Sequence, residues 1–246
     1  MKRKQFQLVG VIAVLSILLM SCMFIGPSVK GNGNVKEEVR QVGEFDQIKV
    51  SRGMNVYITQ GSPAKVVVIA DSNLHELIET KVEGGVLKIT TKENIRWAEE
   101  KKVMVTVEKL TGVDANSGGN VWSQTQIKSD NLKLEANSGA NLTFDVDAGT
   151  LNADCSSGAN IKLSGQAKEA DLGTSSGANL ICQKLKAEQC KMSASSGGNV
   201  SSTVTGKLDA HASSGGNVTY YGEPTSTDVN SSSGGNIHHK QYLSNY

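Results

Sequence analysis

Apolar and polar residues alternate along short stretches from about residue 111 to the end of the chain, and small glycine-containing turns separate these stretches. The stretches "LKLEA" before Asn137 and "IKLSG" after Asn160 show the alternation clearly. A period of two is typical of β-strands that bury one face. We therefore predict a chain built from many short strands.

The turns carry a repeated phrase, which reads Ser-Gly, then Ala or Gly, then Asn. Successive copies begin 21, 19, 19, 20, 18 and 19 residues apart. A repeat near 19 residues without a helical pattern predicts an all-β fold, a parallel β-helix whose coils stack on one another. The phrase begins at Ser117, Ser138, Ser157, Ser176, Ser196, Ser214 and Ser233.

The glycine and asparagine of the phrase are the candidate site residues, with a role that is either structural or adhesive. Glycine allows a positive φ at a sharp corner. Asparagines stacked about 4.8 Å apart along the axis could form an amide ladder, which would point either inward or outward. An earlier copy begins at Arg52. The candidates are Gly53, Asn55, Gly118, Asn120, Gly139, Asn141, Gly158, Asn160, Gly177, Asn179, Gly197, Asn199, Gly215, Asn217, Gly234 and Asn236.

Three positions of the repeat are apolar or small in coil after coil: four before, two before and four after the serine. We expect these columns to fill a narrow interior, which suits a chain with only 4% aromatic residues. Cys155, Cys182 and Cys190 fall in inward columns and are expected to be buried small hydrophobes. A Cys182–Cys190 bridge across one return is the alternative.

The first residues predict export and a lipid anchor. "MKRKQFQ" is basic, "LVGVIAVLSILLM" is apolar but short for a membrane span, and "LMSC" resembles a bacterial lipobox. We expect a lipoprotein signal peptide over residues 1–21 and lipidation of Cys22. An ordinary cleaved signal is the alternative. Residues 22–40, which contain "GPSVKGNGNV", are expected to form a flexible tether.

A single β-helix domain is expected over residues 41–240, with N-terminal coils at 41–110 and Ser-Gly-x-Asn coils at 111–240. "KVVVIA", "GGVLKITT" and "KVMVTVEKL" are strands that could fill the first coils. The polar segment Lys92–Lys102 is expected as an excursion, and Trp97 in it either contacts a ligand or folds back on the solenoid. Residues 241–246 are expected to cap the last coil with Tyr242, Leu243 and Tyr246.

Charge and motif content exclude several kinds of partner. Without Lys2, Arg3 and Lys4 the chain keeps 22 of its 25 basic residues against 24 acidic ones, with no basic patch, so nucleic acid is not expected. There is no CxxC spacing, and the adjacent His238 and His239 would face opposite sides of a strand, so neither a metal nor another cofactor is expected.

Enzymatic activity on a polysaccharide would need acidic residues that converge on one face. Four aspartates lie in or near one outward column, and we interpret them as a solvated strand face rather than a catalytic one. They are Asp154, Asp171, Asp209 and Asp228.

The opening "FDQIKV", then "RGMNVYITQG", "GGVLKITT" and the serial "SGAN" and "SGGN", resemble the head GIN domain family of proposed auto-transporter adhesins, found in Bacteroidetes-type bacteria. The resemblance covers about residues 39–239. It implies a right-handed, pectate-lyase-like β-helix without catalytic residues, and a role in cell adhesion. The family is named after a Gly-Ile-Asn repeat, and in this chain the residue between Gly and Asn is Ala, Gly or Met, never Ile.

The favoured hypothesis is therefore a non-catalytic outer-membrane lipoprotein, held to the membrane by its lipid. It would present a repetitive Ser/Gly/Asn surface to a glycan or a cell-surface protein. The alternatives are a periplasmic scaffold or envelope sensor and, less favoured, a polysaccharide-active enzyme. The segment after Cys22 has no acidic residue before Glu37, which favours the periplasmic leaflet, so the leaflet stays undecided.

Overall fold

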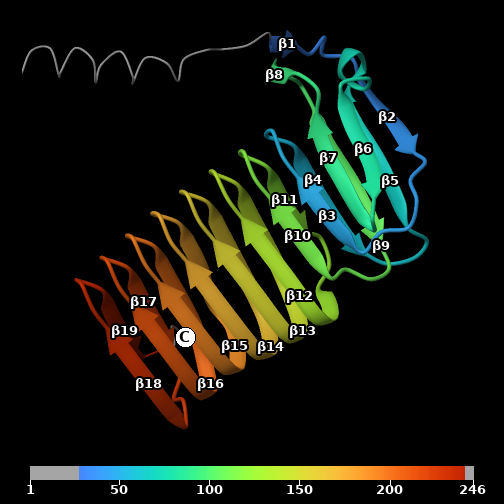
Figure 1. The fold of residues 1–246 in the computed structure, drawn as a ribbon. Helices are drawn as coiled ribbons and strands as arrows, with labels where there is room; N and C mark the ends of the chain where they lie inside the picture. The colour runs from blue at the N-terminus through green and yellow to red at the C-terminus, as the bar shows by residue number, and fades with distance from the viewer. Residues whose placement is uncertain (1–27, 242–246) are drawn as a thin grey trace, which may run out of the picture.

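The computed structural model describes residues 28–241. Its coils stack into a solenoid, and a group of N-terminal strands lies at one end (Figure 1). Seventeen of the described strands form one continuous sheet and two short strands form another. The chain makes a β-solenoid of about 7 turns with about 19 residues each, which confirms the fold class and the repeat length predicted from the sequence.

The repeat region contains ten strands, all paired in parallel with strands of adjacent coils; the last two strands, in the last coil, pair only with the coil before them. Asn141 pairs with Asn160 and Cys155 with Thr174, so equivalent residues of successive copies lie side by side. The strands are β10 (Gly112–Ala115), β11 (Asn120–Ser123), β12 (Ile127–Ala136), β13 (Asn141–Cys155), β14 (Asn160–Thr174), β15 (Asn179–Ala194), β16 (Asn199–Ala212), β17 (Asn217–Tyr221), β18 (Ser226–Ser231) and β19 (Asn236–Lys240).

The interior is filled by the columns that the sequence predicts. Leu134, Ala153, Leu172 and Met192 lie one above another and are fully buried. The three cysteines of the described chain, Cys155, Cys182 and Cys190, are buried and free, as expected for small apolar residues. Burial raises the pKa of Cys155 to about 11 and that of Cys190 to about 12, so these thiols stay protonated.

The last coil differs from the others because no described strand covers it. Val229 occupies a column that is buried in every earlier coil, yet it is 49% exposed, and Ile237 is only partly buried. Tyr242, Leu243 and Tyr246 lie outside the described residues, so the expected cap remains a prediction.

The N-terminal third departs from the expectation of plain coils over residues 41–110. Here β3 (Gln47–Val50) and β4 (Asn55–Gln60) form one coil that pairs with β10 and β11. On its far side it pairs in parallel with β7 (Val86–Thr91) and β9 (Lys101–Val107). Three other pairings are antiparallel: β2 (Val35–Arg40) with β5 (Lys65–Asp71), β5 with β9, and β6 (Ile78–Glu83) with β7.

A two-glycine turn explains one part of this departure. Gly84 and Gly85 have φ angles of 58° and 78°, so the chain reverses between β6 and β7 instead of continuing around a coil. Two positive φ angles define the tight hairpin turn that glycine pairs favour. These added strands cover the N-terminal end of the solenoid core.

The expected tether is ordered from residue 28 onward. It contains β1 (Ser28–Lys30), which pairs with β8 (Asn94–Trp97), and β2. Between them the chain wraps the buried carboxylate of Asp71, which accepts the backbone N–H of Gly33 at 2.8 Å and that of Glu100 at 3.1 Å. A side chain at Gly31 would collide with this carboxylate. Gly31 therefore allows a close approach to the carboxylate, and Gly33, with φ of 73°, allows the left-handed turn that brings its N–H to Asp71.

Burial alone would raise the pKa of Asp71, but the backbone hydrogen bonds from Gly33, Glu100 and Glu99 outweigh it and leave the pKa lowered. A 3-10 turn over Ser72–Leu74 follows directly. Within residues 28–241, no helix has the length and apolar character needed to cross a membrane. Cys22 and the signal segment 1–21 lie outside the described residues.

Candidate functional site

Each Ser-Gly-x-Asn phrase closes a two-residue turn at one edge of the solenoid. The seven serines have φ between 48° and 53°, and the glycines that follow have φ between 69° and 77°. In the turn at Ser157, the N–H of Ala159 donates to the carbonyl of Ser156 at 3.1 Å. Two left-handed residues in succession make a turn that suits the strand twist, and glycine adopts it without steric cost.

Neighbouring turns are also bonded to one another. The N–H of Gly158 donates to the carbonyl of Ser176 in the following coil at 3.1 Å, and that of Gly139 donates to Ser157 at 3.2 Å. The serines themselves occupy a conformation that non-glycine residues adopt infrequently. The stacked turns therefore hold these serines in place and leave them exposed along one ridge.

The third residue of the phrase points into the core, which explains why it is small. Ala159 and Ala178 are fully buried. A β-carbon added at Gly198 would lie 2.8 Å from Thr174 Oγ1 and 2.9 Å from the backbone nitrogen of Ser175, so only glycine fits that copy. Met54 fills the same place in the first copy.

The asparagines form one unbroken ladder, and they point outward because a buried residue precedes and follows each of them from Asn55 to Asn217. From Asn120 onward, each side-chain amide donates to the side-chain oxygen of the asparagine in the preceding coil, over distances of 2.8–3.1 Å. The members, in the order of the ladder, are Asn55, Asn120, Asn141, Asn160, Asn179, Asn199, Asn217 and Asn236.

The ladder uses most of its own hydrogen-bonding capacity. In five copies the same amide nitrogen also donates to the carbonyl of the glycine two residues earlier, at 3.1–3.4 Å. An asparagine amide has two N–H groups, so both are engaged there. The geometry thus favours a structural role for asparagine and glycine, and leaves the serine hydroxyls as the outward groups of this edge.

The aspartates considered for catalysis occupy two columns rather than one. Asp171, Asp209 and Asp228 share a column with Lys191, whereas Asp154 lies in the neighbouring column beside Glu135 and Gly173. Lys191 Nζ lies 3.7 Å from Asp171, and His211 Nε2 lies 2.9 Å from Asp209. These partners make most of the column an ordinary charged strand face.

Asp154 is the exception on that face. Burial, then the neighbouring carboxylates of Asp171 and Glu135, raise its pKa. It lines a shallow groove of about 400 Å³ together with Glu135, Ser193 and His211. Glu135 is ion-paired with Lys133 at 2.8 Å. Within the described chain no three acidic, histidine or cysteine side chains are grouped to hold a metal ion.

Several aromatic side chains make ring contacts, among them Tyr220 and His239, which stack with centroids 4.6 Å apart. Trp97 is 45% exposed, and Lys30 Nζ lies 5.3 Å from its ring centroid, so the segment packs onto β1. Tyr57 and Trp122, which the sequence reading did not single out, stack with centroids 4.8 Å apart and an interplanar angle of 16°. Their equivalent positions, two residues after the ladder asparagine in adjacent coils, are the signal that could have predicted this pair.

Solved structures with this fold come from several related bacteria. One from Bacteroides fragilis, described as "a putative adhesin", has a TM-score of 0.80 at 21% identity, covering 86% of this chain and 100% of that one. One from Parabacteroides distasonis, described as "Putative lipid binding protein", has a TM-score of 0.70 at 17% identity, covering 87% and 100%. A "putative adhesin" from Parabacteroides merdae has a TM-score of 0.66 at 20% identity, covering 87% of this chain and 100% of that one. No curated protein matches the chain.

At these identities the solved structures show a common fold. The family is established by the sequence, because a family model matches residues 44–224. That range contains the first phrase at Arg52–Asn55 and every later copy through Asn217, so the match includes the stacked turns and nearly all of the ladder. The chain belongs to the family described as "Putative auto-transporter adhesin, head GIN domain".

Proposed function

We propose that this protein is a non-catalytic adhesin of the cell envelope, which uses the outer faces of its solenoid to bind a glycan or a cell-surface protein. The observation that carries the proposal is the family match over residues 44–224, combined with a long surface on which each coil repeats the same groups. Repetition supports adhesion because many weak contacts add up when they engage together.

A non-catalytic role fits the chemistry of the described surface. Asp154, the acid with a raised pKa, shares its groove with one other carboxyl group, that of Glu135, which is ion-paired with Lys133. Asp171 lies beside Lys191 and Asp209 lies beside His211. Glycoside hydrolysis needs two cooperating carboxyl groups, one protonated and one ionised. The family and the solved structure from Bacteroides fragilis are both described with the words "putative" and "adhesin", which supports this part of the proposal.

Anchoring at the outer membrane through a lipid on Cys22 is part of the proposal and rests on the sequence "LMSC". Its test is metabolic labelling with a palmitate analogue. The wild-type protein should carry the label, and Cys22→Ala should lose the label and leave the membrane fraction. A labelled Cys22→Ala protein would contradict the anchor.

Protease treatment of intact cells tests adhesion against the alternative, a periplasmic scaffold or sensor. If the solenoid is outside, intact cells should lose the protein, and lysed cells serve as the control for cleavability. A deletion strain should then attach less well to its host surface than a complemented strain. Protection of the protein until lysis would contradict the adhesin and favour the periplasmic alternative.

A further inference from the structure

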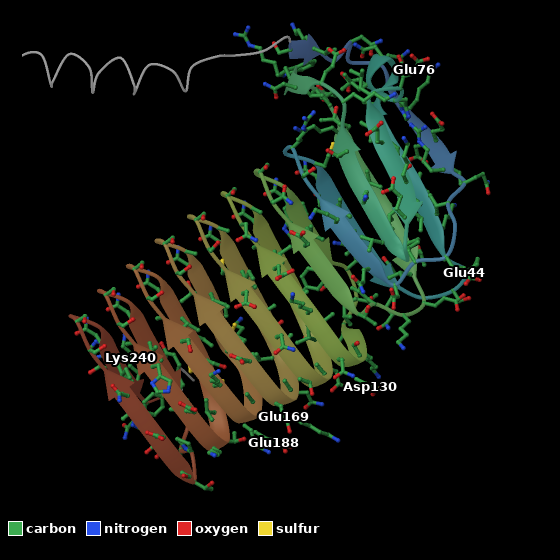
Figure 2. The ribbon with its side chains drawn as sticks, in the orientation of Figure 1. Glu44, Glu76, Asp130, Glu169, Glu188 and Lys240 are labelled. Carbon is green, nitrogen blue, oxygen red and sulfur yellow. The ribbon has the colours of Figure 1, made fainter. Side chains whose placement is uncertain are left out.

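A groove of about 870 Å³ runs along the solenoid on a side that the Ser-Gly-x-Asn edge does not include. It crosses β12 to β16, so several coils contribute to it. It is larger than the groove of about 400 Å³ beside Asp154. Figure 2 shows Asp130 and Glu188, two of its lining residues, along one border of the coil stack.

The register of the strands explains why a groove forms here. One wall is the column Lys128, Asp147, Gln166 and Lys186. The other wall lies two residues further along each strand and consists of Asp130, Gly149, Lys168 and Glu188. Between the walls, the small residues Ser129, Ala148 and Ala167 form the floor. The floor repeats from β12 to β14, and each strand from β12 to β15 contributes at least one charged wall residue.

The charges of the groove are balanced but not paired with one another. Lys109, Lys128, Lys168 and Lys186 line it together with Glu108, Asp130, Asp147 and Glu188. Within residues 28–241, none of these eight side chains forms an ion pair within 4.0 Å. Asp147 accepts a hydrogen bond from Gln166 at 2.9 Å, and Glu108 accepts one from Ser62 at 2.7 Å.

This pattern selects a class of ligand. A polyanion would meet the carboxylates of both walls, and a polycation would meet the lysines, so each would be repelled at half of its contacts. A hydroxyl group can accept a hydrogen bond from an ammonium group and donate one to a carboxylate. An uncharged polymer rich in hydroxyls can therefore hydrogen-bond to both kinds of charged residue along the groove, with at least one charged side chain available in each of β12 to β15.

We propose that this groove binds a neutral polysaccharide chain laid along the solenoid axis, with its hydroxyls between the two charged walls. The inference deepens the proposed adhesive function and rests on it, because it names the ligand class and the binding surface. Repeated contacts in successive coils supply the affinity, since hydrogen bonds to exposed charged groups are individually weak.

The test is native gel electrophoresis of the full-length protein in gels that contain one polymer each. The neutral probes are β-glucan, mannan and galactan, with polygalacturonate as the polyanion and polylysine as the polycation. At least one neutral polymer should retard the wild-type protein, with little effect of added salt, because no charged ligand group is screened.

The variant Lys186→Ala/Glu188→Ala removes one facing pair from the walls and keeps the net charge. Each side chain is exposed and without an ion pair in the described structure, so the fold should persist, which circular dichroism will check. Binding should weaken about tenfold, as expected for losing one or two hydrogen bonds to charged groups. Lys128→Ala/Asp130→Ala repeats the test at another coil, and Lys162→Ala/Glu223→Ala is the charge-matched control outside the groove.

The inference is wrong if neutral polymers retard both groove variants as much as they retard the wild-type protein. It is also wrong if only the charged polymers, or none of the five polymers, retard the wild-type protein. Cell attachment is measured separately with the same variants. If cells that carry the groove variants still attach, the groove is not the adhesive surface, although the protein remains an adhesin. If the groove binds a polymer but the wild-type protein supports no cell attachment, the adhesive function is wrong and the polysaccharide site stands.

Discussion

Breaking the asparagine ladder in its middle should destabilise the whole solenoid. Asn160 donates to Asn141 at 3.0 Å and accepts from Asn179 at 3.0 Å. Asn160→Ala removes both bonds. The side-chain oxygen of Asn141 then has no donor, and one side-chain N–H of Asn179 has no acceptor. At about 0.5–1.5 kcal/mol for each hydrogen bond, the expected loss of unfolding free energy is about 1–3 kcal/mol. Because water reaches part of the ladder and can replace the lost partners, we expect the loss of unfolding free energy to lie toward the lower end of this range.

The position of the substitution gives the prediction its internal control. Asn236, at the last coil, donates to Asn217 at 3.1 Å and to the Gly234 carbonyl at 3.3 Å, and no later asparagine donates to it. Because Asn236 is exposed and Asn160 is half-buried, water can replace the lost bonds more readily at Asn236, and Asn236→Ala should cost less than Asn160→Ala. Asn152 is exposed on the outer face of β13 and belongs to no ladder, so Asn152→Ala should be close to neutral.

Urea unfolding of the three variants and the wild type, followed by far-ultraviolet circular dichroism, measures these differences. A single transition with unchanged slope would allow the midpoints to be converted to free energies. If Asn160→Ala shifts the midpoint no more than Asn152→Ala does, the ladder does not stabilise the fold, and the structural interpretation of the motif is wrong.

Three further predictions concern other parts of the fold. The Asp71 carboxylate should stabilise the N-terminal strands above the pKa of the unfolded state, about 4, and this contribution should be lost as the pH falls through its lowered folded-state pKa. Asp71→Asn should thus lower the melting temperature at pH 7 and flatten its acid dependence, and an unchanged profile would contradict this. Cys155 and Cys190, with pKa values of about 11 and 12, should resist iodoacetamide at pH 8 until urea is added, and rapid labelling of the native protein would show that they are accessible. Gly198→Ala should destabilise by about 1–3 kcal/mol in urea, because its new methyl group overlaps Ser175, and a neutral result would show that the turn can shift.

The sequence predicted those features that follow from the repeat alone. A period near 19 residues implies that equivalent positions of successive coils stack on one another. This stacking predicts the buried column that contains Leu134 and Leu172, the buried cysteines and the amide ladder. Even the outward direction of Asn160 could have been inferred, since it has the opposite parity to the buried Ile161.

Features that depend on contacts outside the repeat were not predicted. Gly33 and Asp71 are 38 residues apart, and nothing in "GNGN" distinguishes a loop that wraps a carboxylate from a flexible linker. The Gly84–Gly85 turn was read as the start of a strand, although two adjacent glycines before an alternating stretch are a hairpin signal. The wall residues of β15 align with those of β14 only after a register shift between Lys162 and Ser164, so their alignment needed the observed register.

The direction of the ladder has a consequence for how the chain is made. In every step the later asparagine is the donor and the earlier one is the acceptor. A coil that is synthesised later therefore finds its acceptor already fixed by the preceding coil, on a base that the N-terminal antiparallel strands close off. Growth can proceed one coil at a time from that base, with each addition gaining its hydrogen bond at once, as expected for a linear array of nearest-neighbour contacts. The direction of the ladder therefore suits folding from the N-terminus toward the C-terminus.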